Sequence, residues 1–472
     1  MQRIKANISP KTKKKVEGVY KIILQDVKPT ESEIKVINSC VNDLMGRLKK
    51  VAPKGVEIVN LGSVARGTNM RGNHDIDIFI LYPQRMDEKE MEKEGMNLAK
   101  KIVAKHKGES FYIKYAEHPY VQLMLNDLGI KADLVPAFKI KNASERITAV
   151  DRTQLHNKFL SENLTKKQKD DVIVLKAFLK SHSIYGAGAE VEGFSGYLCE
   201  LLVYHYGSFM DVLANIASLR LPILIHPLDR EEYQGTDGAV KEAVKKFGRE
   251  FIVIDPTDED RNVAAVVTDE SLARFIIISK IFLKNPTANF FYGTKYSDTF
   301  SERKLLRLRK ELGLDIYAVH MKTPDIAEDI IWQQVRRMKG RIDFELRKNS
   351  FVPVLAFENV SKENAVIAFF ISNAHIKYTE HKGPSVFMGE AMQKFIDSHP
   401  RSLGMYFEQH RIVSIEEAEH KSPDSVINAI LAGKEGLPDF AKKKGGIKLH
   451  INTLPEDAAK LVYRAFIRKT SI

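Results

Sequence analysis

Two aspartates separated by one residue, Asp75 and Asp77, are well placed to hold a metal ion. They open the run DIDIFILY, in which polar and apolar residues alternate as in a half-buried strand. Because residues two apart on a strand point to one face, the carboxylates project together, and Ile76, Ile78 and Ile80 project into the core. Adjacent carboxylates repel unless a cation lies between them, and hard oxygen ligands suit magnesium. The spacing therefore predicts a Mg²⁺ site.

A glycine-serine turn lies shortly before these aspartates, in the run LGSVARGT. Gly62 allows the backbone to approach a ligand closely, because glycine has no Cβ. Ser63 supplies a hydroxyl and Arg66 supplies a fork of N–H donors, both suited to phosphate oxygens. Since residues 56–60 read as a strand, the turn and the aspartate strand together predict a nucleotide-binding hairpin.

A third carboxylate, Asp133, lies in the later strand-like run IKADLVPAF. Its neighbours Ala132 and Leu134 point to the opposite, apolar face of that strand. Three acids from two strands supply the ligands that a two-metal phosphoryl-transfer site requires. We therefore expect Asp133 to join Asp75 and Asp77 as a catalytic residue and metal ligand.

The elements that must position these residues divide the chain into three parts. In residues 1–150, predicted strands carry the acids, and Thr30 and Glu33 form a capping box that begins a helix beside the sheet. Residues 151–285 are mostly helical in pattern, and residues 286–472 combine basic helices with strands. The pattern predicts an α+β multidomain protein with a catalytic domain, a helical domain that closes over the nucleotide, and a separate α+β unit.

The charge balance favours a polyanionic partner. There are 73 Lys and Arg residues against 61 Asp and Glu residues, a net charge of +12. A generally Lys- and Glu-rich surface, as in heat-adapted proteins, is the alternative explanation. Clustering of the cations favours a surface that follows a phosphate backbone; the clusters are residues 11–15, 303–310, 336–348 and 442–448.

The remaining composition argues for the reducing cytoplasm. No apolar run approaches the ~20 residues that span a bilayer, and the basic N-terminal run lacks the apolar core of a signal peptide. The two cysteines, Cys40 and Cys199, support neither a disulfide framework nor a zinc site. We expect a cytoplasmic protein with no membrane interaction.

The turn and the Asp-x-Asp strand together resemble the signature of the DNA polymerase beta-type nucleotidyltransferases. Over nearly its whole length, the chain also resembles the archaeal-type, class I, CCA-adding enzymes, which are tRNA nucleotidyltransferases. The first acid is often Glu in these relatives and is Asp75 here. The runs that carry the resemblance are LGSVARGT, DIDIF, IKADLVPAF, AVDRTQLHNKFL, LKAFLKSHSIYG, GFSGYLCELLVYHYGSF and DPTDEDRNVAA.

The resemblance implies Mg²⁺-dependent addition of C, C and A to the 3′ end of tRNA from CTP and ATP, without a nucleic acid template. It makes Asp75, Asp77 and Asp133 the metal ligands. It also implies an arrangement of head, neck, body and tail, in which the body and tail bind the tRNA acceptor arm. The sequence leaves the oligomeric state open, although relatives of this class are often homodimers. The residues that match nucleotide-holding positions are Ser63, Arg66, His156, Lys176 and Tyr185.

Some of these residues also have simpler explanations. Without the resemblance, Lys176 reads as an exposed helix lysine and His156 as an ordinary helix residue. Arg261 follows the run DPTDED at the expected start of a helix, and it is the candidate for base selection. An ion pair with Asp258 or Glu259 explains Arg261 equally well.

Other functions of the same fold stay open at this point. A poly(A) polymerase or oligoadenylate synthetase would share the head and its acids. A non-catalytic RNA-binding protein on this scaffold is a second alternative, although the three intact acids argue against it. A small-molecule nucleotidyltransferase is a third, but it would not need a long basic tail.

Overall fold

The computed structural model describes residues 8–103, 109–115, 119–126, 128–228, 237–292, 302–433, 437–442 and 446–470. The chain folds into two compact units, Met1–Lys295 and Tyr296–Ser471. Each unit has its own sheets and hydrophobic core. None of the helices in the described ranges combines the length and apolar character that a membrane span requires.

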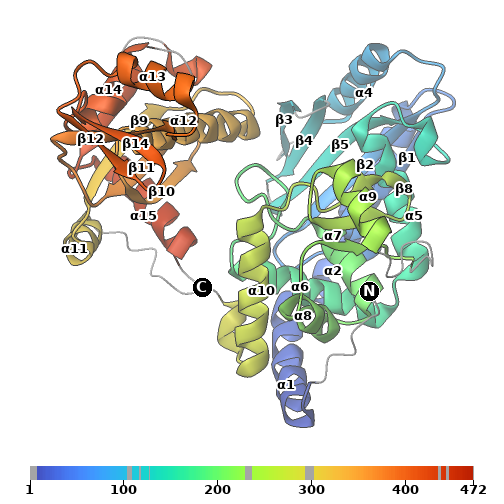
Figure 1. Ribbon diagram of the computed structural model, residues 1–472. Helices are drawn as coiled ribbons and strands as arrows, with labels where there is room; N and C mark the ends of the chain where they lie inside the picture. Colours follow the sequence, from blue (N-terminus) through green and yellow to red (C-terminus); the bar gives the residue numbers. More distant parts are fainter. Residues whose placement is uncertain are drawn as a thin grey trace. The chain divides into compact units, whose positions relative to one another are not determined.

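The first unit contains a five-stranded sheet in the order β1-β2-β5-β4-β3 (Figure 1). Strands β2 and β5 run parallel, whereas the other neighbours in this sheet are antiparallel. Helices α2 (Glu31–Val51) and α4 (Glu88–Val103) pack against this sheet. The strands are β1 (Glu57–Leu61), β2 (Asp75–Tyr82), β3 (Glu109–Tyr115), β4 (Pro119–Leu125) and β5 (Ile130–Phe138).

The alternation along β2 gives the sheet its two different faces. Ile76, Ile78 and Ile80 are fully buried in the core shared with α2 and α4, as the sequence pattern predicts. Helix α2 begins at the predicted capping box, because Thr30 Oγ1 accepts from the Glu33 backbone N–H at 3.2 Å and Glu33 Oε2 accepts from the Thr30 N–H at 2.6 Å. The aspartates of β2 therefore lie on the face opposite these helices.

The rest of the first unit is largely helical and shares one core. The rings of Phe178, Phe209 and Phe282 contact one another at its centre, with centroids 5.4–6.1 Å apart. On the N-terminal helix, only Val16 and Ile23 are buried. Such a narrow apolar face gives little indication of a helix in the sequence. The helices are α1 (Pro10–Val27), α5 (Thr153–Asn163), α6 (Lys166–Ser181), α7 (Gly196–Tyr206), α8 (Phe209–Ala217) and α10 (Asp269–Lys284).

A small sheet corrects the prediction for Arg261, which lies in a strand and not at the start of a helix. The chain turns after Asp255, whose carboxylate accepts hydrogen bonds from the Thr257 backbone N–H at 2.9 Å and hydroxyl at 2.8 Å. This turn allows Asp255 to pair with Asp258 in an antiparallel hairpin. The sheet consists of β6 (Ile223–Ile225), β7 (Phe251–Asp255) and β8 (Asp258–Asn262), and α9 (Asp237–Phe247) packs on it.

The second unit combines helices with two antiparallel sheets. One sheet has the order β10-β11-β9-β15, with β9 (Asp315–Lys322), β10 (Pro353–Val360), β11 (Asn364–Ile371) and β15 (Ile447–Ile451). The other has the order β12-β14-β13, with β12 (Tyr378–Ser385), β13 (Gly404–Glu408) and β14 (Arg411–Glu417). The helices are α11 (Glu302–Leu312), α12 (Glu328–Lys348), α13 (Gly389–Ser398), α14 (Pro423–Gly433) and α15 (Glu456–Thr470).

Candidate active site

Asp77 and Asp133 lie directly beside each other across the parallel strands β2 and β5. Asp75, two residues earlier on β2, pairs in register with Lys131 and points to the same face as Asp77. Gln122 Nε2 on β4 donates a hydrogen bond to Asp133 Oδ1 at 2.9 Å. The sheet thus brings the three predicted acids to one place on one face.

Gly62 holds the glycine-serine turn against Asp77. The turn is a short helix, α3 (Gly62–Arg66), that begins directly after β1, and Leu61 of β1 pairs with Asp77. Gly62 has φ +77°, a left-handed conformation that favours glycine, and a Cβ there would lie 1.9 Å from Asp77 Oδ2. Ser63 follows directly and is half-buried, so its hydroxyl is carried by a turn that is fixed to the acids.

Burial and mutual repulsion raise the pKa of two of these acids. For Asp77, burial is the largest cause, followed by the charges of Asp133 and Asp75; its pKa rises to about 7, although Arg66 acts in the opposite direction. Burial also raises the pKa of Asp133, against the hydrogen bond from Gln122. A cation would relieve this repulsion.

The donor set fits a divalent metal ion by its chemistry. Three carboxylates are the hard oxygen ligands that Mg²⁺ accepts. In the described ranges, no three His, Cys, Asp or Glu side chains already surround one point as metal ligands do. The acids therefore offer ligands on one sheet face and not a closed cage.

A buried ion cluster centred on Glu200 joins the turn to the helices. Glu200 on α7 is fully buried and accepts hydrogen bonds from Arg66 Nε at 3.1 Å and Arg66 Nη2 at 2.8 Å. Thr68 Oγ1 donates to Glu200 Oε1, and Lys176 Nζ lies 3.7 Å from the same oxygen. Arg66 Nη1 donates to Asn157 Oδ1 at 3.1 Å. The Nε and Nη2 groups of Arg66 are therefore already bound to a protein carboxylate.

Lys176 is only 1% exposed, so the simpler explanation of an exposed helix lysine is wrong. Its Nζ donates to the Thr68 carbonyl at 3.1 Å, and burial lowers the pKa of Lys176. Tyr185 lies close to it, since a Cβ at Gly196 would lie 3.3 Å from Tyr185 Oη and 3.4 Å from Lys176 Nζ. Burial is the main cause of the raised pKa of Tyr185, and Asp75 also contributes. Tyr185 is therefore within electrostatic reach of the acids.

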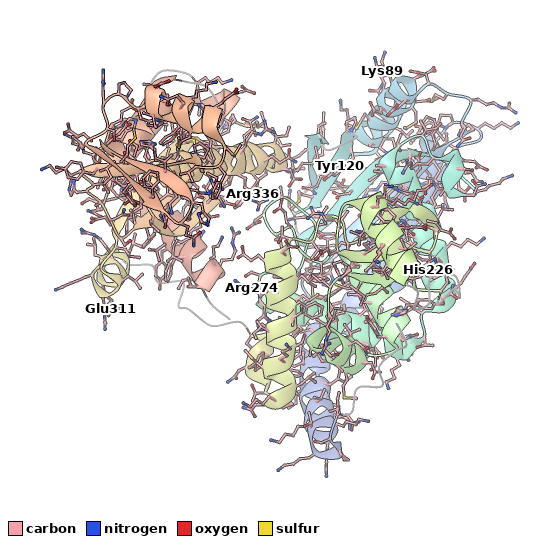
Figure 2. All side chains as sticks on the ribbon, in the orientation of Figure 1. Lys89, Tyr120, His226, Arg274, Glu311 and Arg336 are labelled. Atoms are coloured by element: carbon pink, nitrogen blue, oxygen red, sulfur yellow. The ribbon has the colours of Figure 1, made fainter. Side chains whose placement is uncertain are left out.

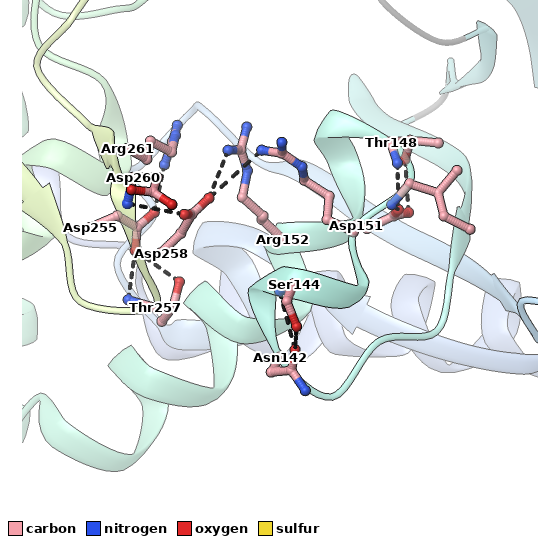
Figure 3. A network of polar contacts seen from close by, with 12 residues as sticks. Asn142, Ser144, Thr148, Asp151, Arg152, Asp255, Thr257, Asp258, Asp260 and Arg261 are labelled. Atoms are coloured by element: carbon pink, nitrogen blue, oxygen red, sulfur yellow. Dashed lines mark hydrogen bonds and ion pairs between the residues drawn. The ribbon is translucent and has the colours of Figure 1, made fainter. Parts of the chain in front are cut away.

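A second network surrounds Asp255, which is fully buried at the end of β7 (Figure 3). Its carboxylate accepts hydrogen bonds from the Tyr197 hydroxyl at 2.9 Å and Arg261 Nη1 at 2.9 Å, and it lies 2.8 Å from His156 Nε2. The His156 ring stacks on Tyr197 with centroids 4.0 Å apart. Although burial opposes it, the hydrogen bond and charge of His156 and the contacts with Thr257 and Arg261 hold the pKa of Asp255 well below its usual range.

Arg261 forms an ion pair, but the acid is Asp255 and not Asp258. Asp258 pairs instead with Arg152 at 3.1 Å and with Arg146 at 3.7 Å (Figure 3). The Arg261 side chain is 31% exposed, so it is anchored at one nitrogen and still accessible. The ion pair with Asp255 therefore leaves part of the Arg261 side chain accessible to a nucleotide base.

The sequence-based reasoning missed two residues, Glu200 and Asp255. Each is an isolated acid in an otherwise apolar run, GFSGYLCELLVYHY for Glu200 and FIVID for Asp255. Acids are rarely buried unless they are paired, so an acid inside an apolar run is the signal that could have identified them.

Acids neutralise part of the cation cluster on α12 in the second unit. Glu358 of β10 pairs with Arg336 (labelled in Figure 2) at 2.9 Å, and it also pairs with Lys339. Arg337 is exposed on the same helix. Fewer cations of α12 are therefore available to bind phosphate than the number of Lys and Arg residues in this helix suggests.

Three family models match successive parts of the chain. A nucleotidyltransferase domain matches residues 41–156, and the second domain of tRNA nucleotidyltransferase matches residues 170–292. The C-terminal domain of the CCA-adding enzyme matches residues 313–438.

Full-length relatives agree with these models. The CCA-adding enzyme of Methanocaldococcus jannaschii is 31% identical over 452 residues, which cover 93% of this chain and 96% of that protein. The CCA-adding enzyme of Archaeoglobus fulgidus is 32% identical over 416 residues, 88% of this chain and 89% of that protein.

The chain belongs to the CCA-adding enzyme family. The predicted family, the nucleotidyltransferase fold of the head and the class of enzyme are thereby confirmed. Structures of the Cid1 poly(U) polymerase align with 60% of this chain and 99% of that one, at a TM-score of 0.47 and 16% identity. That likeness is too remote to bear on the function of this CCA-adding enzyme family member.

Proposed function

We propose that this protein adds C, C and A to the 3′ end of tRNA from CTP and ATP, without a nucleic acid template, and releases pyrophosphate. Membership of the CCA-adding enzyme family supports the substrates. The observation that carries the chemistry is the placement of Asp77 beside Asp133 on parallel strands, against the turn at Gly62.

Asp75, Asp77 and Asp133 are the residues that would hold magnesium, in a family whose members generally use divalent metal ions. When bound, Mg²⁺ neutralises the triphosphate and lowers the pKa of the attacking 3′ hydroxyl. The chain itself supplies alignment, on which phosphoryl transfer largely depends. The fixed contact of Gly62 with Asp77 keeps the turn in register with the acids.

The cations of the Glu200 cluster act on the triphosphate. Arg66 and a protonated Lys176 would together carry one positive charge more than Glu200 balances, in a buried place where charges act strongly. The hydroxyls of Ser63 and Tyr185 add hydrogen-bond donors to the phosphate oxygens.

The Asp255 network acts on the nucleoside end of the substrate. Its carboxylate orients His156 and Arg261, and the arginine donates hydrogen bonds to acceptors on the C and A bases.

The body and tail bind the acceptor arm of tRNA through exposed cations. The division into residues 1–150, 151–285 and 286–472 stays a prediction that limited proteolysis tests.

A gel assay tests the function. Purified protein receives Mg²⁺, a tRNA that lacks its last three nucleotides, and labelled CTP, ATP or both. Two C from CTP alone, and one further A only when ATP is also present, are the expected products. Long A tracts from ATP alone would indicate a poly(A) polymerase, and no incorporation would indicate a non-catalytic RNA-binding protein. Light scattering of the same sample determines whether the protein is a monomer or a homodimer.

A further inference from the structure

We propose that Glu200 is a positioning residue for the incoming nucleotide and that it acts through Arg66 and Lys176. The inference rests on the function proposed above, because that function makes Arg66 and Lys176 nucleotide-binding residues. Glu200 itself lies behind them, fully buried on α7.

The contact between Glu200 and Arg66 fixes the plane of the guanidinium. Two nitrogens of Arg66 donate to the two oxygens of Glu200, at 3.1 and 2.8 Å, which is the bidentate geometry that orients arginine best. A third nitrogen donates to Asn157. Arginine has five N–H groups, and the further ones on Nη1 and Nη2 point away from Glu200. The carboxylate thus decides where these donors are directed.

The same carboxylate holds Lys176. The Thr68 hydroxyl donates to Glu200 and lies 3.4 Å from Lys176 Nζ, while that Nζ is 3.7 Å from Glu200. Without the negative charge, two cations would face each other in a dry interior, which strongly disfavours the charged lysine. Glu200 therefore helps to hold Lys176 in place, and its negative charge favours the protonated form of the lysine.

The cluster also connects the catalytic turn to the helices. Arg66 ends α3, which carries Ser63, whereas Lys176 lies on α6 and Glu200 on α7. Gly62, at the other end of this five-residue helix, lies against Asp77, because a Cβ there would lie 1.9 Å from Asp77 Oδ2. A shift of the Arg66 guanidinium would therefore also displace α3 and Ser63, where we propose that the triphosphate binds.

Glu200→Gln and Glu200→Asp test the role, because Gln keeps the size and removes the charge, whereas Asp keeps the charge and is too short to reach both nitrogens. Glu109→Gln is a matched control. Glu109 accepts hydrogen bonds from Arg47 Nη1 at 3.1 Å and Nη2 at 2.9 Å and is also largely buried, but it lies on β3, apart from the turn.

The readout is KM for CTP and ATP against KM for tRNA, with the melting temperature measured in parallel. We expect Glu200→Gln to raise KM for the nucleotides about tenfold or more, with KM for tRNA little changed and a smaller rise for Glu200→Asp. A lower melting temperature with unchanged nucleotide KM, or an equal rise for Glu109→Gln, would overturn the proposal. If Glu200→Gln does not fold, the Asp variant decides by the same criteria.

Calorimetry of CTP and ATP binding in Mg²⁺, without tRNA, separates this inference from the proposed function. Weaker nucleotide binding by the Glu200 variants supports the positioning role even if the acceptor is not tRNA. Failure of the wild-type protein to extend tRNA would contradict the function alone. Equal nucleotide affinity of wild type and variants would contradict the positioning role alone.

Discussion

Gly62 and Asp77 approach so closely that a single methyl group on Gly62 would lie 1.9 Å from Asp77 Oδ2. The backbone of the turn and the carboxylate cannot move independently of each other. The contact explains why a glycine stands at this position, apart from its positive φ.

Gly62→Ala should therefore slow transfer strongly, because the new Cβ displaces Asp77 from its place beside Asp133. A loss of kcat of about 10²-fold or more is expected, measured on the tRNA that lacks CCA. Gly67→Ala is the control, since Gly67 has φ +69° but no atom within 4 Å of its virtual Cβ. It should cost about 1–2 kcal/mol of stability from backbone strain and keep most of the activity. Equal kinetic losses in both variants would refute the steric explanation.

Asp133→Asn should spare nucleotide binding and abolish transfer. In this variant Asp75 and Asp77 stay on β2, where we propose that they hold a metal on the triphosphate, whereas Asp133 comes from β5. We expect the affinity for CTP to change by less than about threefold and kcat to fall by about 10³-fold. Asp77→Asn is the comparison and should lose both. A parallel loss of binding in Asp133→Asn would rule out this division of labour.

Arg261→Ala should reduce the preference for CTP over UTP by about tenfold, because a base-reading donor is lost. Asp255→Asn should act in the same direction, since it releases the arginine from its anchor. Lys246→Ala is the control. This exposed lysine on α9 pairs at 2.5 Å with Asp260, which lies on β8 next to Arg261. Misincorporation of UTP into the tRNA measures the preference. Unchanged selectivity in Arg261→Ala would remove the arginine from base selection.

Asp171→Asn should stabilise the protein above pH 6. Burial raises the pKa of Asp171 from 3.8 to about 6, so between these values the folded state keeps a proton that the unfolded state releases. The free energy of unfolding therefore falls as pH rises through this window, by an amount on the order of 2 kcal/mol. The variant should melt higher than wild type at pH 8 and similarly at pH 4.

The neighbouring residue provides the control for this pH dependence. Asp170 pairs with Lys28 at 2.6 Å, so Asp170→Asn should give no gain in melting temperature at pH 8. A pH profile of Asp171→Asn parallel to that of wild type would contradict the role of burial.

The affinity for tRNA should fall steeply with salt, because phosphate contacts release counterions. Arg337→Ala on α12 should lower the slope of log K against log salt by about 1, since Arg337 is exposed. Arg347→Ala should change it less, because Arg347 already pairs with Asp343 at 2.9 Å. Filter binding at several salt concentrations measures the slopes, and a flat profile for wild type would argue against phosphate binding by this helix.

The sequence predicted the parts of the site that depend on local periodicity. Alternation was enough to place Asp75 and Asp77 on the polar face of β2 and Asp133 on the polar face of β5, because the pleat directs side chains within each strand. That the two strands are neighbours depends on the order of the sheet. The capping box likewise defined the start of α2 from Thr30 and Glu33.

Contacts between distant residues could not be predicted in this way. Arg66 and Glu200 are 134 residues apart, and no local pattern relates them. For Arg261, nearness in sequence favoured Asp258, but the β7–β8 hairpin brings it to Asp255. The cation cluster at residues 336–348 was overestimated for the same reason, since Glu358 comes from another element to pair with Arg336.

The distance along the chain between Arg66 and Glu200 has a consequence for synthesis. The ribosome makes Arg66 and Thr68 long before their common acceptor, so a nascent chain that ends before residue 200 has no carboxylate to receive either donor. If the five-stranded sheet folds before α7 is made, its three aspartates would be in place. Arg66 and Lys176, which we propose bind the triphosphate, would not yet be held by Glu200. Competence for nucleotide binding should therefore arise late in translation, when α7 has emerged and docked.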